Sequence, residues 1–362
     1  MAKKIVKGIG LAVLAILTVL VIALIAGRTV TKVRYQVKGE NSIYEMAYPE
    51  INGQKQYLLI KGENAENPVI LWLHGGPGSP DSFVDYCFIR PLADEYTVVA
   101  WDQRGCGETY FRNAGLDPMN ETVSFAQALE DVDAVVDYLR DRFGKEKIVI
   151  AGHSYGTILG TNYVAQHPEK VECYVGVGTA AGAVKGYLAS CEDAVRIASA
   201  RGEDTSRLRE AYENCLKDRS LDNVMKLKQL SDPYHKGAKD KSGNAAVIGL
   251  LSPDLRLLHI RWLLKTTDLK GFFDLNRGLM GPVLMDDDML ADAGPGFSVP
   301  MGFVNGSADW TTPAFLVEEY YEKITAPEKD LVIMEECGHS PQTDDPEGFV
   351  QILKTMLDSI RS

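Results

Sequence analysis

The stretch 147-KIVIAGHSYGTILG-160 combines a strand pattern, a tight turn and the start of a helix. Its apolar run at 148–151 is followed by glycine and predicts a strand buried on both faces. The residues after Gly156 have helical character. Glycine at positions 152 and 156 removes Cβ atoms that would clash in a strained turn. The stretch therefore predicts a strand–turn–helix unit that exposes Ser154 at its apex, where a serine can act as a nucleophile.

Five other apolar runs have strand character, and helical patterns separate them. The six expected strands lie at 68–75, 96–103, 147–154, 171–179, 300–307 and 330–338. Between the second and the third, the apolar residues of 125–143 recur every three or four positions, and Gly144 follows as a stop signal. This alternation of strands and helices predicts a mostly parallel sheet with helices on both faces.

One long region interrupts the alternation. Residues 183–298 have helical patterns and almost no strand signal. Because they fall between the fourth and fifth expected strands, we expect them to form a helical cap over the carboxyl edge of the sheet. The predicted organisation is a membrane anchor at 1–28, a core formed by 29–182 and 299–362, and the cap at 183–298.

A serine nucleophile needs a base, and the base needs an acid that orients it. On a turn of this kind the acid follows the serine in the chain, and the base comes last. His339 fits the base, because it follows the last expected strand in a loop shaped by glycine and proline. Asp309 fits the acid, because it lies two residues beyond the preceding strand; a helix N-cap is its other possible role. Glu335 and Glu336 are weaker alternatives for the acid.

The loop 74-HGGPG-78 follows the first expected strand. Its glycines allow backbone N–H groups to approach the oxyanion that forms when a carbonyl is attacked. We expect Gly76 to supply one such donor, with Gly75 as the alternative, and the amide of Tyr155 to supply the other. His74 is expected to be structural.

Three motifs carry a family resemblance. HGGPGS, WDQRGCGET at 101–109 and GHSYGT are similar to those of the proline iminopeptidase branch of the α/β-hydrolases. The resemblance covers about residues 68–180 and 300–360. It implies an α/β-hydrolase fold with a helical cap whose acidic residues bind a substrate's free α-amino group. The tryptophan-rich, glutamate-ending cap segment of the family is not recognisable, and the nearest acidic features are Glu192 and 286–288.

The motifs lead to one expected function with two alternatives. Ser154, Asp309 and His339 predict a serine hydrolase that works through an acyl-enzyme. The resemblance implies that its substrates are short peptides, from which it releases N-terminal residues, with proline preferred. A carboxylesterase or lactonase with the same three residues is the first alternative, and a non-catalytic ligand-binding hydrolase homologue is the second. We expect neither a metal nor an organic cofactor.

The N-terminal run 8-GIGLAVLAILTVLVIALIA-26 contains no charge. At about 1.5 Å per residue it can just cross a hydrocarbon core of roughly 30 Å. It is longer than the apolar region of most cleaved signal peptides, and a buried core helix would need no basic flanks. We therefore expect a single-pass transmembrane anchor, and the short N-terminal tail favours an extracytoplasmic catalytic domain.

Charge and cysteine content limit the partners and the redox state. The formal net charge is −12, although the first 38 residues contain seven basic residues and no acidic one. The rest of the chain is therefore strongly acidic, which argues against a nucleic-acid partner. The six cysteines form no CxxC pair and are scattered, which favours buried reduced thiols; Cys191 and Cys215 are the one pair considered for a disulfide.

Overall fold

The computed structural model describes residues 2–235, 243–284 and 286–361. Its main feature is an eight-stranded sheet in which β6, β5, β7, β8, β9 and β10 are parallel neighbours. Strand β4 is antiparallel to both β1 and β6. The order across the sheet is β1 (Ile43–Ala47), β4 (Tyr57–Gly62), β6 (Thr97–Asp102), β5 (Val69–Leu73), β7 (Ile148–His153), β8 (Val171–Val177), β9 (Met301–Gly306) and β10 (Lys329–Met334). The predicted mostly parallel sheet is confirmed.

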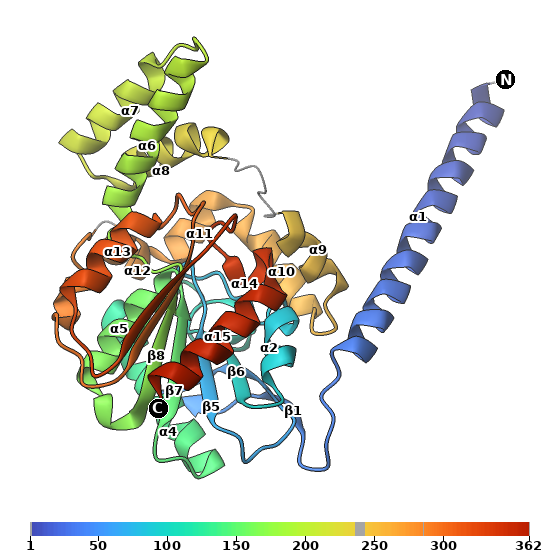
Figure 1. Cartoon of the computed structure of the whole chain (residues 1–362). Coiled ribbons are helices and arrows are strands. Elements are labelled where there is room, and N and C mark those ends of the chain that lie inside the picture. The colour runs from blue at the N-terminus through green and yellow to red at the C-terminus, as the bar shows by residue number, and fades with distance from the viewer. Residues whose placement is uncertain (1, 236–242, 285, 362) are drawn as a thin grey trace.

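Helices cover both faces of this sheet (Figure 1). One face packs on α4 (Phe125–Phe143), α5 (Tyr155–Gln166) and α13 (Ala314–Lys323), and the other on α2 (Tyr86–Leu92) and α15 (Pro346–Ile360). The smaller elements are the hairpin β2 (Glu50–Ile51) and β3 (Gln54–Lys55), the helices α3 (Gly107–Asn113) and α14 (Pro341–Asp344), and the 3₁₀ turns η1 (Pro168–Lys170), η2 (Asp232–Tyr234) and η3 (Ala291–Ala293).

Strand β5 shows why its sequence is continuously apolar. Leu71 and Leu73 belong to the core under α4 and α5, whereas Ile70 and Trp72 belong to the core under α2 and α15. Successive side chains of a strand point to opposite faces, so a strand covered on both sides is apolar at every position. All six predicted strands are present; five are buried in this way, and β10 is a partly buried strand at the edge of the sheet.

Helix α4 ends where its sequence predicts. The Ser124 hydroxyl accepts a hydrogen bond from the amide of Gln127 and caps the N-terminus. Gly144 adopts the left-handed conformation at the C-terminus, with φ 60°.

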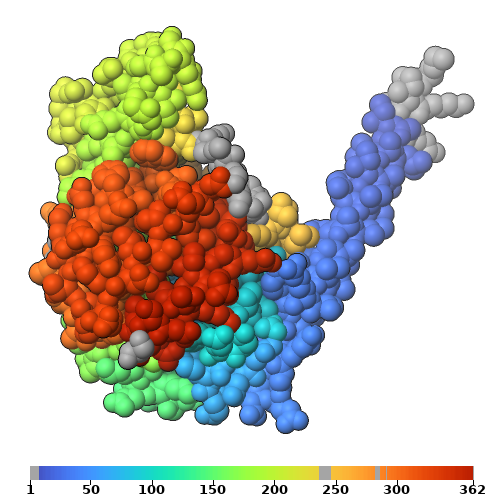
Figure 2. Space-filling model, in the orientation of Figure 1, coloured from blue at the N-terminus to red at the C-terminus, as the bar shows by residue number. Residues whose placement is uncertain are grey.

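The insertion between β8 and β9 is helical, as predicted. It contains α6 (Ala183–Ala200), α7 (Ser206–Lys217), α8 (Leu221–Ser231), α9 (Gly243–Leu251), α10 (Leu257–Thr266), α11 (Leu269–Leu275) and α12 (Arg277–Leu284). Helices α6, α7 and α8 have a hydrophobic core of their own. They project from the body in Figure 2, beyond the carboxyl edge of the sheet.

The N-terminal helix α1 (Ala2–Arg34) extends away from the rest of the chain (Figures 1 and 2). Its segment Gly8–Arg34 is long enough to cross a membrane and contains an 18-residue stretch with a mean hydropathy of 3.1, although a signal sequence has the same properties. Its C-terminal end contacts the body, where Thr31 donates to the carbonyl of Leu251.

All six cysteines are free and buried. Cys191 and Cys215 both lie in the hydrophobic core of α6, α7 and α8, where they pack as apolar side chains.

Candidate active site

Ser154 occupies a strained turn between β7 and α5. Its backbone has φ 53° and ψ −119°, which is unfavourable for a residue with a Cβ. The turn is tight because the chain folds closely against its neighbours. A Cβ at Gly156 would lie 2.1 Å from the carbonyl oxygen of Leu73, and one at Gly152 would lie 2.4 Å from that of Gly156. Both outer glycines are therefore required by backbone packing.

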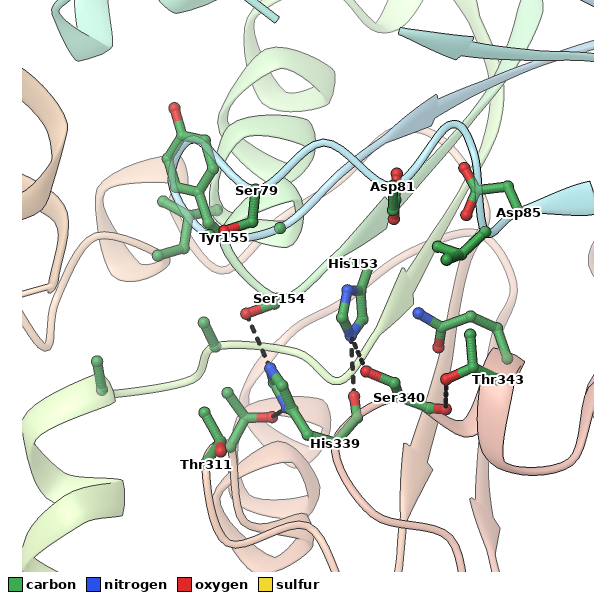
Figure 3. A pocket seen from close by; sticks show the side chains of 18 of the residues that line it. Ser79, Asp81, Asp85, His153, Ser154, Tyr155, Thr311, His339, Ser340 and Thr343 are labelled. Carbon is green, nitrogen blue, oxygen red and sulfur yellow. Dashed lines mark hydrogen bonds between the residues drawn. The ribbon is translucent and has the colours of Figure 1, made fainter. Parts of the chain in front are cut away.

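The structure brings Ser154, His339 and Asp309 into one chain of hydrogen bonds. Nε2 of His339 lies 2.9 Å from Oγ of Ser154. Nδ1 of His339 lies 2.9 Å from Oδ2 of Asp309. Figure 3 shows the imidazole ring directed at Ser154. The three residues follow β7, β9 and β10, which are parallel, so their carboxyl ends converge on one edge of the sheet.

Asp309 is buried and held by several donors. Its Oδ1 accepts from the amides of Thr311 and Thr312, each at 2.8 Å, and its Oδ2 accepts from the Thr312 hydroxyl at 2.6 Å. Burial opposes ionisation, but His339 and the Thr312 hydrogen bonds outweigh it and hold the pKa of Asp309 below its ordinary value. The carboxylate is thus charged at neutral pH and can fix the imidazole with Nδ1 protonated. The Thr312 hydroxyl is a contribution that sequence analysis missed.

His153, the second residue of the pentapeptide, supports the loop that carries His339. Its Nε2 lies 2.9 Å from the carbonyl oxygen of His339. Burial, followed by the nearby His339, lowers the pKa of His153 to about 3, so this ring is neutral. A neutral ring can donate to that carbonyl and fix the loop. Nothing in the sequence around position 153 indicated this contact with the loop that carries His339.

The expected oxyanion loop lies against the nucleophile. A Cβ at Gly75 would lie 3.0 Å from the Cβ of Ser154, so only glycine allows this approach. Gly76 has φ 116°, and it lines the same pocket as Gly75, Ser154 and Tyr155. Tyr155 is the first residue of α5, so its amide has no acceptor within the helix. These positions suit the expected donors, and whether Gly76 or Gly75 supplies the loop donor stays a prediction.

His74 joins two of the motifs. Its Nδ1 donates to the carbonyl of Gly75 at 2.8 Å, and its Nε2 accepts from the amide of Gln103 at 3.3 Å. Burial lowers the pKa of His74 to about 4, which keeps the ring neutral. The neighbouring Arg104 makes a buried two-pronged ion pair with Asp131 of α4. Loops 74–78 and 101–109 are therefore held together by buried polar contacts.

A cleft of about 410 Å³ opens above Ser154. The core supplies its floor, and the cap supplies Ala183 and Tyr187 of α6 and Lys228 of α8. The Lys228 ammonium pairs with Asp232 at 2.8 Å. These cap residues could not be identified from the sequence, because a helical pattern does not show which turn of a helix lines a pocket formed by residues far away in the chain.

The carboxyl groups in the cleft come from the core. Of the described residues that line it, Asp81 and Asp85 carry carboxyl groups; in Figure 3 they lie beyond His153 as seen from Ser154. Burial raises the pKa of Asp81 to about 6, and burial with the adjacent Asp81 raises that of Asp85 well above its ordinary value. The acidic cap residues considered from the sequence lie elsewhere. Glu192 accepts from Tyr212, and Asp287 accepts from the amides that begin α6.

Three other histidines lie beside carboxylates away from Ser154. His167 faces Asp133, His235 faces Asp193 and His259 faces Glu108. Within the described residues, no group of three or more histidine, cysteine, aspartate or glutamate side chains is arranged to hold a metal ion.

Fold, motifs and site together define an α/β-hydrolase. Residues 68–346 match the family described as alpha/beta hydrolase fold, and the chain belongs to that family. It is 25% identical over 323 residues to a protein named probable aminopeptidase YbaC from Bacillus subtilis, covering 87% of this chain and 96% of that relative.

Other relatives match over shorter stretches. The proline iminopeptidase PfmaB of Pestalotiopsis fici is 32% identical over 136 residues, which cover 37% of this chain and 43% of that protein. Proline iminopeptidases from Lactobacillus helveticus match over 40% of their length, at 28% identity. The resemblance predicted from the three motifs is confirmed by these relatives.

Solved structures show the same fold. A proline iminopeptidase-related protein from Thermus thermophilus superposes with a TM-score of 0.58 at 18% identity, covering 88% of this chain and 98% of that one. A bacterial membrane phospholipase A superposes with a TM-score of 0.54 at 20% identity and covers 99% of both chains. At these identities the likeness concerns the fold alone.

Proposed function

We propose that this chain is a serine hydrolase that works through an acyl-enzyme. The observation that carries the proposal is the unbroken set of contacts from Asp309 through His339 to Oγ of Ser154, each at 2.9 Å. Nε2 of His339 accepts the hydroxyl proton as Oγ attacks a substrate carbonyl. The amides of Tyr155 and of Gly76 or Gly75 then stabilise the oxyanion.

The second half of the reaction uses the same groups. Protonated His339 gives its proton to the leaving group as the carbonyl re-forms, which leaves the acyl group on Ser154. Water then attacks the acyl carbonyl and passes a proton to His339. The bond from that carbon to Oγ of Ser154 breaks, His339 returns its proton to Oγ, and the acid product leaves the free enzyme. Asp309 stays ionised throughout and stabilises the imidazolium.

The substrate class that we favour is short peptides with a free N-terminus, with proline preferred at the first position. A relative that matches over 87% of this chain is named a probable aminopeptidase, and several relatives with shorter matches are named proline iminopeptidases. A peptide's α-ammonium group entering a partly dry cleft needs a carboxylate partner. Among the described lining residues Asp81 fits this need, because its pKa of about 6 leaves it mainly ionised at neutral pH.

A carboxylesterase or lactonase is the second candidate, and one observation favours it. The charged group that the cap contributes to the described lining of the cleft is the Lys228 ammonium, not a carboxylate. A cation at this wall disfavours a free amine nearby and suits a neutral or acidic acyl substrate.

Parallel assays of free prolyl arylamide, its N-acetyl derivative and an aryl ester separate the two candidates. An aminopeptidase should lose at least about tenfold in kcat/KM on acetylation. Asp81→Asn should reproduce that loss on the free amine, whereas Asp204→Asn, a change at an exposed carboxylate, should not. Equal rates on free and acetylated substrates would favour the esterase.

The N-terminal helix completes the proposal as a single-pass anchor with the catalytic domain extracytoplasmic. Its segment Gly8–Arg34 contains a long apolar stretch, and none of that stretch is buried inside the protein. A soluble core helix would bury such a surface. The full chain should stay with membranes after a carbonate wash and keep its own N-terminus; a cleaved N-terminus would support a signal sequence.

A further inference from the structure

A set of large apolar side chains faces outward on three consecutive cap helices, and the first of these helices, α9, contacts α1. They belong to α9, α10 and α11 and are between 39% and 77% exposed. We call them the apolar cap face: Val247, Leu250, Leu257, Ile260, Leu263, Leu264 and Leu269. Several exposed apolar side chains on consecutive helices indicate an interaction site more than scattered single residues do.

Helix α10 exposes more large apolar side chains than an ordinary surface helix does. Its polar His259 and its Trp262 are buried against the core, whereas Leu257, Ile260 and Leu264 are exposed. These three leucine and isoleucine positions are spaced by three and four residues, so they share one side of the helix. A surface helix normally exposes its polar side, so this side needs an apolar environment to be stable.

The orientation of the apolar cap face is fixed by the core. Between α9 and α10, Asp254 makes a buried ion pair with Lys61 of β4 and accepts from the Tyr44 hydroxyl at 2.6 Å. Arg256 pairs with the buried carboxylate of Glu108 at 3.1 Å. Truncating either partner of such a buried pair is costly, so this connection is held firmly in one position.

The same connection is bonded to the end of α1. Arg28 donates from Nε to the carbonyl of Ser252 at 3.1 Å and from Nη2 to that of Leu255 at 2.8 Å. A Cβ at Gly27 would lie 2.7 Å from a side-chain carbon of Leu251, so α1 and α9 are in close contact. Figure 2 shows the segment around residue 250 exposed beside α1.

These contacts fix the position of the apolar cap face along the axis of α1, relative to the proposed membrane span. The uncharged run ends at Ala26, and Arg28 lies about 3 Å further along the helix axis. The connection that Arg28 binds is therefore at the boundary where the span leaves the hydrocarbon. Arg261 and Lys265 of α10 are exposed beside the apolar residues, and their cations lie over the rings of Phe111 and Tyr110.

We infer that the apolar cap face rests in the interfacial region of the lipid bilayer that holds α1. The inference rests on the proposed membrane anchor and extends it from the helix to the catalytic domain. The membrane-spanning part of α1 and the apolar cap face are linked by hydrogen bonds. Both would then lie in the same lipid bilayer. A second copy of the chain is the competing occupant.

Site-directed fluorescence in the full-length chain tests this inference. Because the six native cysteines are buried, a cysteine introduced at an exposed position can be labelled selectively with an environment-sensitive dye. The informative variants are Leu250→Cys and Leu264→Cys. Leu216→Cys on α7 is the matched control, because Leu216 is also an exposed leucine of the cap, and Leu17→Cys reports on α1 itself. A thermal melt followed by circular dichroism checks that each variant folds.

The labelled proteins are reconstituted into vesicles with lipids spin-labelled at shallow or deep positions. We expect shallow labels to quench the dye at 250 and 264 at least about threefold more than at 216, and deep labels to quench it at 17. Quenching at 17 but not at 250 or 264 would overturn the inference and leave the anchor standing. No quenching at any position would overturn both. A blue-shifted dye at 250 that ignores lipid quenchers and disappears on dilution of the protein would assign the face to a second copy.

Discussion

The indole N–H of Trp262 donates to the carbonyl oxygen of Gly78 at 3.1 Å. This bond joins α10 of the cap to the loop that carries Gly75 and Gly76. Asn276, the residue between α11 and α12, adds a second contact, because a Cβ at Gly78 would lie 2.3 Å from its Oδ1. The oxyanion loop is therefore positioned partly by the cap, and the outward side of the same α10 forms part of the apolar cap face.

Removing that bond should slow the chemical step. Trp262→Phe keeps most of the apolar contact with Tyr110 but leaves the Gly78 carbonyl without its donor, at a cost of about 1–3 kcal/mol. We expect kcat to fall about tenfold with a smaller change in KM. Phe111→Leu loosens the packing around the same indole but keeps the bond, and should leave kcat near wild type. Unchanged kcat in Trp262→Phe would show that the cap does not position the loop.

Asp309 and the Thr312 hydroxyl should contribute unequally to kcat. Asp309→Asn should lower kcat by about 10⁴-fold, because the amide no longer fixes the required imidazole tautomer. Thr312→Val removes one hydrogen bond to the carboxylate, worth about 1.5–3 kcal/mol, and should lower kcat by roughly ten- to a hundredfold.

Thr311→Val is the matched control for the threonine. Thr311 reaches Asp309 through its backbone amide, which the substitution keeps. Its kcat should stay within about threefold of wild type. Equal losses in the two threonine variants would mean that the Thr312 hydroxyl has no special role.

The glycine at position 156 should be required for folding rather than for chemistry. In Gly156→Ala the added methyl would lie 2.1 Å from the Leu73 carbonyl, and the backbone of both elements would have to move. We expect a loss of about 3 kcal/mol or more in the free energy of unfolding, measured by denaturant titration in detergent micelles. Gly115→Ala meets nothing within 4 Å and should change the stability little. Similar stabilities in the two variants would contradict the packing argument.

Acid sensitivity should depend on His74. Its pKa falls from 6.5 to about 4 on folding because the ring is buried. Between those values the unfolded chain binds a proton that the folded chain does not, so the free energy of unfolding decreases as the pH falls through this window. The contribution approaches about 1.4 kcal/mol per pH unit.

His74→Asn removes this titration while keeping a donor near the Gly75 carbonyl. Its stability should therefore fall less steeply than that of the wild type from pH 6.5 to pH 4, whatever its stability at pH 8. Parallel curves for the two proteins across that window would refute the role of His74.

The core elements were predictable because their causes are local. Five of the six predicted strands are almost completely buried, the sixth, β10, is a partly buried edge strand, and the turn at Ser154 needs glycine on both sides for the backbone to pass Leu73. Strands β1 and β4 were not predicted. Strand β1 is partly exposed at the sheet edge, and Lys61 of β4 is buried because it pairs with Asp254 from the distant cap. No neighbouring residue in the sequence indicates such a partner.

The three residues that the structure brings together at the proposed site could be selected from the sequence, whereas their surroundings could not. Order along the chain was enough to select Ser154, Asp309 and His339. The Thr312 hydroxyl, the His153 ring and the Lys228 ammonium act through contacts that depend on how loops and cap fold over the sheet. The acidic residues expected to bind a substrate amine were sought in the cap, whereas the described carboxyl groups in the cleft belong to the core.

Covalent labelling of the full-length protein by a fluorophosphonate tests the central claim most directly. The Ser154 oxygen should displace fluoride from the probe, and mass spectrometry of the digested protein should find the phosphonyl group on Ser154 alone. The label should disappear in Ser154→Ala, together with at least about 10⁴-fold of the turnover of peptide or ester substrates. A label on another residue, or an Ser154→Ala variant that keeps wild-type turnover, would contradict the mechanism. A wild-type protein that takes no label and turns over no substrate would instead be a non-catalytic member of the family.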